Sequence, residues 1–186
     1  MRAERAVEKV RERLLRTAKA LEDADVPYVV VGGNAVAVWV GSKDEGAIRN
    51  TKDVDVLLNR ADLGRAAEAM SKVGFDLHEA NGVTMFLDRD DPMPSRGVQL
   101  LFSGERVKPS DPYPAPEVVK GLRSPEGVDA IELGRLLVLK LNAFRDIDRV
   151  HIRDMMHVGL IDQTWIEKIP ERLRARLQEI LDDPDG

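Results

Sequence analysis

The sequence predicts an α+β fold in which a mixed sheet is flanked by helices, with a helical part at the C-terminal end. Of its 186 residues, 43% are hydrophobic and 33% are charged, the balance of a folded globular chain. Short β-branched runs lie among helical segments up to about residue 102, and the pattern is helical from about residue 131 onward. Strands followed by a run of helices are typical of an α+β sheet domain with a helical appendage.

The N-terminal segment 1–22 suits an amphipathic helix, because apolar side chains recur at helical spacing at Val7, Val10, Leu14, Ala18 and Leu21. The β-branched run 28–31 stops at Gly32 and Gly33, which predicts a buried strand and then a tight turn. The small and apolar residues 34–40 predict a short helix, and the polar stretch 41–50 predicts a loop.

A second strand is expected at 53–58, followed by a helix over 60–74. The segments 75–80, 83–88 and 97–102 predict three strands in a meander, because their connections contain turn-forming residues. The proline-rich residues 103–127 predict an extended connector that wraps the surface. Helices are expected at 131–145, 148–159 and 163–182, the last with one apolar face that covers the other helices or a second subunit. We therefore predict an α+β domain over 1–127 and a helical region packed on it over 128–186.

Composition and charge narrow the class of function. The formal net charge is −5, whereas proteins that hold nucleic acid mainly by its phosphates usually carry a strong basic excess. The chain has no cysteine, so disulfides, zinc–thiolate sites and thiol nucleophiles are excluded. No apolar run reaches the ~18–20 residues of a membrane span, and the charged start is unlike a signal peptide, so we expect a cytoplasmic protein without membrane contact.

Two acidic residues interrupt an apolar strand in the stretch "RNTKDVDVLL". Residues i and i+2 of a strand point to the same side about 6–7 Å apart, so the carboxylates of Asp53 and Asp55 repel each other. A polar strand face or a turn cap would tolerate the pair, and a divalent cation such as Mg²⁺ between the two would make it useful. Because Val54 and Val56 have to face the core, both acids are expected to face one common surface.

A diglycine follows the first predicted strand in the stretch "VVVGGNAVAV". Glycine lets the backbone approach a ligand closely, and the N-terminus of the helix that follows offers free N–H groups to a phosphate. A lone diglycine marks a turn in most proteins. The stretch is neither a dinucleotide fingerprint nor a Walker loop, because it lacks both G-x-G-x-x-G and G-K-[ST].

Together, "GGNA" and "RNTKDVDVLL" resemble the nucleotidyltransferase fold of the DNA polymerase beta superfamily, closest to its minimal bacterial branch with abortive-infection, toxin–antitoxin-like proteins. The resemblance covers roughly residues 25–145 and implies a nucleotidyltransferase-like sheet for the α+β domain. It also implies that the paired acids, Asp53 and Asp55, are catalytic and bind two Mg²⁺ ions. The residues that it places around the nucleotide are Gly32, Gly33, Asn34, Arg49 and Thr51.

The resembling proteins carry a third acid on a later strand, as a metal ligand and base. The matching position in "RGVQLLFSGE" is Gln99, which is neutral and accepts no proton at neutral pH. Three explanations remain open. The protein is inactive and retained for binding, or a single nucleotide-bound metal suffices, or a nearby acid takes over, namely Glu105, Asp88 or Asp90.

Lys140 interrupts the apolar stretch "LLVLKL", where a lysine either extends to the surface or meets an anion. The phrase "LKLNAFRDIDRVHIRD" is similar to the segment over the nucleotide in the resembling proteins. That similarity implies that Lys140 reaches a phosphate and that Asp154 orients the basic side chains. Structural roles are expected for the three histidines, His78, His151 and His157.

The leading hypothesis is a Mg²⁺-dependent nucleotidyltransferase that moves a nucleoside monophosphate from an NTP to an acceptor hydroxyl. The acceptor would be an RNA end, a protein or a small molecule. The second hypothesis is a catalytically inactive descendant of that fold, which binds a nucleotide or a partner protein, and Gln99 is the residue that favours it. A homodimer or a protein partner is compatible with either hypothesis.

Overall fold

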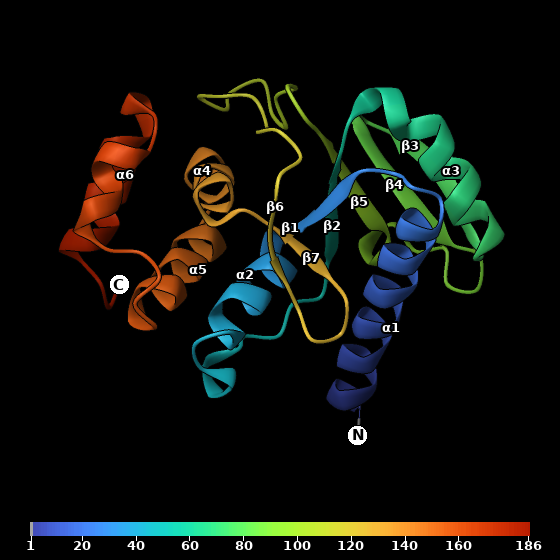
Figure 1. Cartoon of the computed structure of the whole chain (residues 1–186), viewed down its shortest axis with the longest axis horizontal. Coiled ribbons are helices and arrows are strands. Elements are labelled where there is room, and N and C mark those ends of the chain that lie inside the picture. Colours follow the sequence, from blue (N-terminus) through green and yellow to red (C-terminus); the bar gives the residue numbers. More distant parts are fainter. Residues whose placement is uncertain (1) are drawn as a thin grey trace.

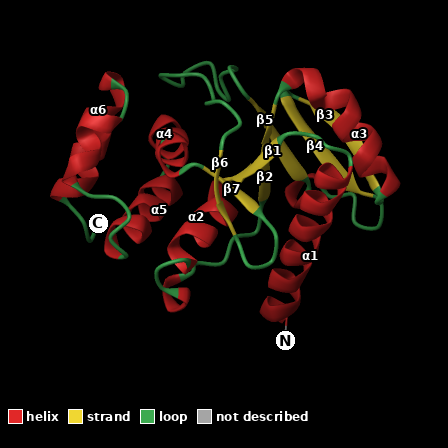
Figure 2. Ribbon diagram, in the orientation of Figure 1, coloured by secondary structure: helices red, strands yellow, loops and turns green. Residues whose placement is uncertain are grey.

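A computed structural model describes residues 2–186, with side chains from residue 5 onward. Its centre is a seven-stranded mixed sheet in the order β3-β4-β5-β2-β1-β7-β6 (Figures 1 and 2). The strands are β1 (Tyr28–Val31), β2 (Val54–Leu58), β3 (Phe75–Ala80), β4 (Val83–Asp88), β5 (Val98–Phe102), β6 (Lys120–Arg123) and β7 (Asp129–Ile131). The predicted α+β class, with a mixed sheet flanked by helices, is therefore confirmed.

Helices cover both faces of this sheet. The helices are α1 (Arg2–Asp23), α2 (Gly32–Gly41), α3 (Leu63–Lys72), α4 (Leu133–Ala143), α5 (Asp146–His157) and α6 (Glu171–Asp182). The first and third pack on one face, and α2, α4 and α5 lie on the other, with α6 outermost (Figure 1). Among the described residues, no helix is long and apolar enough to cross a membrane.

The alternation of side chains along β1 and β2 explains these two layers. Val30, Val54 and Val56 are fully buried in the core beneath α1 and α3. Their neighbours Val29 and Leu57 point to the opposite face and pack in the core beneath α2 and α4. Both central strands are thus apolar on two sides, as expected of strands covered by helices on both faces.

The predicted meander of three strands is confirmed. β3 pairs with β4 and β4 with β5, each antiparallel, and β5 then lies parallel to β2. The β3–β4 turn consists of Asn81 and Gly82, both at positive φ, which is the backbone of a two-residue hairpin turn. The meander therefore carries β5 next to the strand that holds the acidic pair.

The region between the meander and the C-terminal helices differs from the prediction. The connector expected over 103–127 contains β6, and the helix expected from 131 begins at Leu133 instead. β7, only three residues long, pairs parallel with β1 through Val30 and Ala130 and antiparallel with β6. Strands of three or four residues are too short to show alternation in the sequence. Pairing with distant segments, rather than a local pattern, determines where they form.

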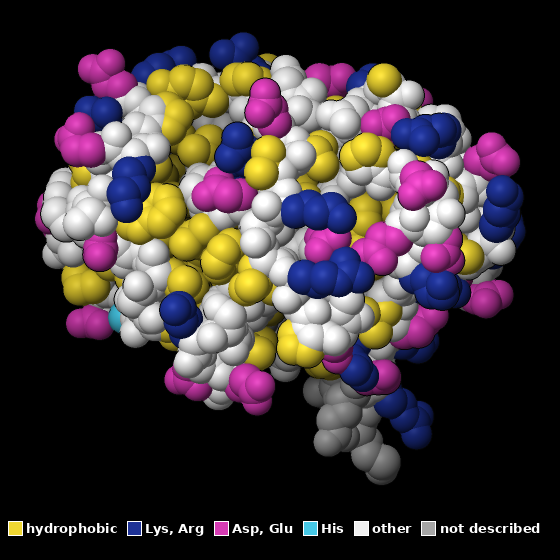
Figure 3. Space-filling view, viewed as in Figure 1, with side chains coloured by type: hydrophobic (Ala, Val, Ile, Leu, Met, Phe, Trp, Pro, Cys, Tyr) yellow, Lys and Arg dark blue, Asp and Glu magenta, His cyan; other side chains and the backbone are white. Residues whose placement is uncertain are grey.

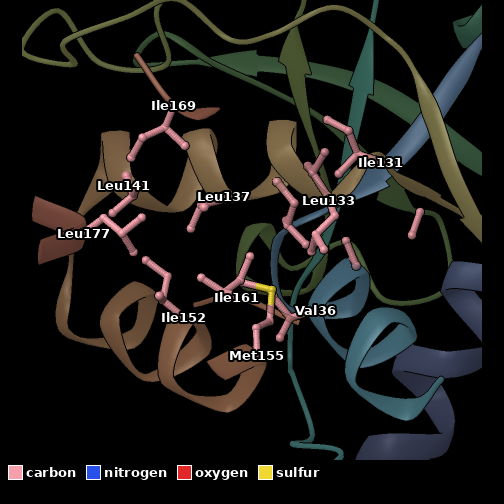
Figure 4. Close-up of a cluster of buried hydrophobic side chains, with 14 of the residues drawn as sticks. Val36, Ile131, Leu133, Leu137, Leu141, Ile152, Met155, Ile161, Ile169 and Leu177 are labelled. Atoms are coloured by element: carbon pink, nitrogen blue, oxygen red, sulfur yellow. The ribbon is translucent and has the colours of Figure 1, made fainter. Parts of the chain in front are cut away.

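Two further predicted helices begin later than expected. Residues 60–62 form a 3₁₀ turn before α3, and Gln163–Lys168 form another before α6. Pro170 explains the second break, because a proline ring clashes with the preceding helical turn and is tolerated at a helix start. The apolar face of α6 covers the other helices, as one of the predicted alternatives stated (Figure 4).

The C-terminal end of α4 is fastened to α6 by one arginine. Nη1 of Arg176 donates to the carbonyl oxygens of Leu141 and Asn142 at 2.7 Å and 2.9 Å. The chain then turns at Phe144, whose φ of 49° is left-handed, and the Arg176 guanidinium lies 5.0 Å from the Phe144 ring centre. Arg176 thereby satisfies carbonyl groups that the end of a helix leaves without partners.

Charged side chains are distributed without a single dominant sign on the face that Figure 3 shows. Basic and acidic groups alternate over the half that carries α1 and α3, and hydrophobic groups gather over the half with the C-terminal helices. This face therefore offers no extended basic surface of the kind that holds a nucleic-acid backbone.

We expect Arg176→Met to lower the free energy of unfolding by about 1.5–3 kcal/mol, because two carbonyl groups lose a charged donor. Arg174→Met, on the same helix, is the matched control: among the described residues Arg174 makes a single long hydrogen bond, 3.4 Å to the carbonyl oxygen of Ile169, so the loss should be about 0.5 kcal/mol. Urea denaturation followed by circular dichroism measures both. Equal losses for the two variants would contradict the fastening role.

Candidate functional site

A cavity of about 410 Å³ opens where β1 ends and β2 and β5 begin, beneath α4 and α5. Its floor consists of the glycine turn, Asp53 just before β2 and Asp55 within it, together with Gln99 and Leu101 of β5. One wall comes from α4 and the start of α5, and the other from the loop 106–111. The lining mixes carboxylates with cations at Lys52, Lys108, Lys140 and Arg145. This volume lies within the range of small-molecule sites.

The two predicted acids lie on the cavity side of β2. Asp53 and Asp55 both line the cavity, while Val54 between them is fully buried on the opposite face. Asn34 holds the approach to the strand, since its Nδ2 donates to the carbonyl oxygen of Asp53 at 2.7 Å. Asn34 itself is not part of the cavity wall, so its position is that of a support for the acidic strand.

The diglycine lies directly against the acidic strand. Gly32 has a left-handed φ of +64°, and a Cβ atom there would stand 2.1 Å from Oδ2 of Asp55. A Cβ atom on Gly33 would stand 2.7 Å from Oγ1 of Thr51. Any side chain at these positions would therefore push the acidic strand or its preceding loop away. Both glycines are needed for the close approach of the turn to Asp55 and Thr51.

The acidic pair carries unbalanced negative charge. Burial, and then the charge of Asp53, raise the pKa of Asp55 to about 6, and the more distant charges of Lys140 and Arg145 only partly oppose this. Two carboxylates on one side of a strand are hard oxygen donors, and Mg²⁺ commonly takes one or two such ligands and completes its shell with phosphates and water. The residues present therefore fit a divalent cation. Within residues 2–186 no group of three acidic or histidine side chains converges as a metal site, so the pair alone supplies protein carboxylates.

Lys140 reaches the cavity from α4 with only 4% of its surface exposed. Its Nζ lies 3.0 Å from Oδ1 of Asp148, and Nε of Arg145 lies 2.8 Å from Oδ2 of the same carboxylate. Burial alone would raise the pKa of Asp148, but the hydrogen bond from Arg145 and the charge of Lys140 lower it. The carboxylate therefore stays ionised and holds both cations in the wall.

Asp154 and Arg49 lie apart from the cations of the cavity. The two form a bidentate pair, with Nε and Nη2 of Arg49 at 2.9 Å and 3.0 Å from the Asp154 carboxylate. The pair joins the loop before β2 to α5, whereas the sequence places Arg49 at the nucleotide and Asp154 beside Lys140. In the structure Asp148, not Asp154, orients Lys140 and Arg145. Thr51, two residues after Arg49, does line the cavity.

His151 lines the cavity from α5, although the sequence predicts only a structural role for it. Its Cε1 would lie 3.5 Å from a Cβ atom on Gly33, and its Nδ1 is buried without a hydrogen-bond partner among the described residues. Burial and the charge of Lys140 lower the pKa of His151 to about 4, so the ring is neutral at pH 7. No periodic signal distinguishes this histidine from His157, which is exposed.

Gln99 occupies the β5 position directly beside Asp55 in the parallel pairing and lines the cavity. The three acids predicted as replacements lie outside the cavity wall. Glu105 forms a bidentate pair with Arg60, and Asp88 is bonded to Arg16 on α1. The cavity does contain a third carboxylate, Asp111, which the sequence did not single out because the proline-rich segment around it shows no pattern.

We expect Gly32→Ala to lower the free energy of unfolding by about 2–4 kcal/mol, because a left-handed backbone is added to a clash with Asp55. Gly82→Ala is the matched control, since Gly82 also has positive φ but no atom within 4 Å of its Cβ position. The control should lose about 1 kcal/mol. Urea denaturation measures both, and equal losses would show that the glycine turn does not need its contact with Asp55.

The raised pKa of Asp55 predicts a pH-dependent stability. Its carboxyl binds a proton more tightly in the folded than in the unfolded protein, so this stabilisation is complete below pH 3.8 and is lost as the pH rises through about 6. In EDTA, Asp55→Asn should therefore raise the free energy of unfolding by about 1–3 kcal/mol near neutral pH, with no gain at about pH 3.5. Asp53→Asn should give a smaller gain, because it removes only one cause of the shift. Urea denaturation at both pH values measures this, and a destabilised Asp55→Asn near neutral pH would contradict it.

No protein-family profile matches the chain, and no curated protein sequence matches it. Solved structures do. The antibiotic-resistance factor ANT(2'')-Ia in solution superposes with a TM-score of 0.55 and 15% identity, over 93% of this chain and 91% of the other. The crystal structure of ANT(2'')-Ia in complex with adenylyl-2''-tobramycin gives 0.51 and 15% identity, over 88% and 94%.

An antigenic nucleotidyltransferase-like protein from Paracoccidioides brasiliensis superposes with a TM-score of 0.56 and 14% identity, over 95% of this chain and 88% of the other. At these identities the likeness concerns the fold, and the closer resemblance to the abortive-infection branch stays a prediction. The arrangement of the sheet and its helices is that of these structures: the chain has a nucleotidyltransferase fold.

Proposed function

We propose that the protein is a Mg²⁺-dependent nucleotidyltransferase, which moves a nucleoside monophosphate from an NTP to an acceptor hydroxyl. One observation carries the proposal: two neighbouring carboxylates, one of them with a raised pKa, face a cavity directly against a glycine turn. A structural role does not explain the repulsion within this pair, whereas a bound cation relieves it. The nucleotidyltransferase fold makes phosphoryl chemistry the natural use of such a cavity.

The chain's own groups would bind the triphosphate from three directions. Gly32 and Gly33 open α2, and within the described chain no side chain caps that helix terminus, which leaves its N–H groups to a phosphate. Lys140 and Arg145, held by Asp148, would neutralise phosphate charge from the opposite wall. Asp53 and Asp55 would hold Mg²⁺, which supplies charge neutralisation and orientation of the transferred phosphoryl group.

The acceptor class that the cavity favours is a hydroxyl-bearing small molecule. A cavity of about 410 Å³ suits ligands of that size. The net charge of −5 gives no general attraction for a long nucleic acid. The structural neighbour ANT(2'')-Ia has been seen with an adenylylated tobramycin, which makes tobramycin a reasonable first probe for this chain. RNA ends and protein hydroxyls are the alternatives that the test includes.

The second candidate is an inactive nucleotide-binding module. Gln99 favours it, because the β5 position beside Asp55 holds an amide that accepts no proton at neutral pH. Under this alternative the cavity would bind an NTP without transferring any part of it.

Label transfer from the four α-labelled NTPs tests the leading proposal, with tobramycin, total cellular RNA or total protein as acceptor and with Mg²⁺ or EDTA. We expect transfer from one NTP in Mg²⁺ only, with a loss of at least about 100-fold in Asp53→Asn because a metal carboxylate is removed. Lys140→Met should mainly raise KM for the NTP, because it removes a positive charge that would bind a phosphate.

Thermal stability of the same proteins with NTP separates the two candidates. Stabilisation that needs Mg²⁺, together with transfer, supports the enzyme. Stabilisation without transfer supports the binding module, and label transfer that survives Asp53→Asn would show that the metal ligands have been misassigned.

A further inference from the structure

We propose that Asp111 takes the proton of the acceptor hydroxyl, in place of the acid that β5 lacks. The inference rests on the nucleotidyltransferase function proposed above. It assigns a base to a cavity in which both β5 residues, Gln99 and Leu101, are unable to accept a proton. Its grounds are the placement of Asp111, its lack of a cationic partner and the elimination of the other acids.

The structure fixes Asp111 firmly in the cavity wall. Only 8% of the residue is exposed, yet it lines the cavity. Its Oδ2 accepts from the backbone N–H of Lys108 at 2.9 Å, and its carbonyl oxygen accepts from Nε of Arg106 at 3.0 Å. Two residues further on, the backbone of Tyr113 exchanges two hydrogen bonds with the Asn142 side chain of α4. The carboxylate is therefore held between its own tight turn and the end of α4.

Asp111 is a buried carboxylate without a cation. Among the described residues, no side-chain nitrogen of lysine, arginine or histidine lies within 4.0 Å of its carboxylate oxygens, and the Arg106 guanidinium is bonded to the carbonyl oxygen of Asp111 instead. Outside the acidic pair of β2, the other acids of at most 9% exposure are paired: Asp88 with Arg16, Asp129 with Lys120 and Arg123, and Asp148 with Lys140 and Arg145. Buried charges are normally paired, because desolvation is costly. A free carboxylate at a cavity wall therefore points to a role toward what the cavity binds.

Elimination leads to the same residue. The carboxylates that line the cavity are, within the described chain, Asp53, Asp55 and Asp111. The first two lie on one side of the acidic strand, with Asp55 against the glycine turn, and Asp111 does not join them in a three-ligand group. It comes instead from the loop 106–111 on another wall, where it is free to face an acceptor rather than a metal.

The transfer step then balances as follows. The acceptor hydroxyl oxygen forms a bond to the α-phosphorus of the NTP, and the bond from that phosphorus to the bridging oxygen of pyrophosphate breaks. Pyrophosphate leaves with the electron pair of the broken bond. The hydroxyl proton passes to the Asp111 carboxylate and from there to solvent.

The test compares Asp111→Asn with the native chain in two measurements. Label transfer from α-labelled NTPs is followed with tobramycin, total RNA, total protein and water as acceptors, and calorimetry gives the Kd of an α,β-methylene NTP with Mg²⁺. We expect kcat to fall by about 10²–10⁴-fold, as loss of a general base predicts, with Kd changed by no more than about twofold. Asparagine keeps an oxygen for the Lys108 N–H, so the turn should survive.

Two further variants sharpen the result. Glu105→Gln removes the other acid of this segment, which is bonded to Arg60 outside the cavity, and should leave kcat within about twofold. Gln99→Asp in the Asp111→Asn background returns an acid beside Asp55 and should recover at least about tenfold of the lost rate.

Each contrary outcome has a distinct meaning. Native transfer that Asp111→Asn leaves unchanged overturns the role of Asp111 and leaves the nucleotidyltransferase intact. A parallel loss of rate and of NTP affinity assigns Asp111 to nucleotide binding or folding and equally overturns its role as base. A native chain that binds the nucleotide but transfers label to none of the four acceptors overturns the enzyme itself, and the inference with it.

Discussion

The contact between Gly32 and Asp55 is the constraint on which the rest of the cavity depends. Without a Cβ atom at Gly32, the turn after β1 approaches β2 closely enough to enclose the carboxylate of Asp55. Enclosure has an energetic cost, because Asp55 loses solvent beside the like charge of Asp53. Val54 and Val56, on the reverse face of β2, are fully buried, so the strand cannot rotate to return the acidic side chains to solvent. Lys140 and Arg145 on the opposing wall offset part of this negative charge, and Asp148 holds both cations in place.

Much of this local chemistry could be predicted, because strand alternation is a strict rule. Once Val54 and Val56 are assigned to the core, Asp53 and Asp55 have one remaining side, and the structure places both there. The meander could also be predicted from the sequence, since Asn81 and the glycine after it favour one type of hairpin turn. The fold class followed from the order of such elements rather than from any single one.

The other features of the candidate site depend on contacts between distant segments, which the sequence does not show. Asp148 and Asp154 lie on the same helix, and the packing of α5 against α4 brings Asp148 to Lys140, while Asp154 meets Arg49 of a distant loop. Asp111 lies in a proline-rich segment without periodicity, and its place in the cavity depends on the hydrogen bonds between the nearby Tyr113 backbone and Asn142 of α4. His151 is likewise a functional candidate only because α5 packs beside the glycine turn.

The strand β7 has a consequence for how the chain is divided. It pairs with β1, one of the central strands, yet it lies beyond residue 127, where the sequence suggests that the α+β domain ends. A fragment that stopped at that boundary would leave the backbone of β1 as an open edge lined with valines. Such edges recruit strands from other molecules. By supplying β7, the region after residue 127 therefore covers this edge of β1 against pairing with other molecules. The two parts are best produced as one polypeptide.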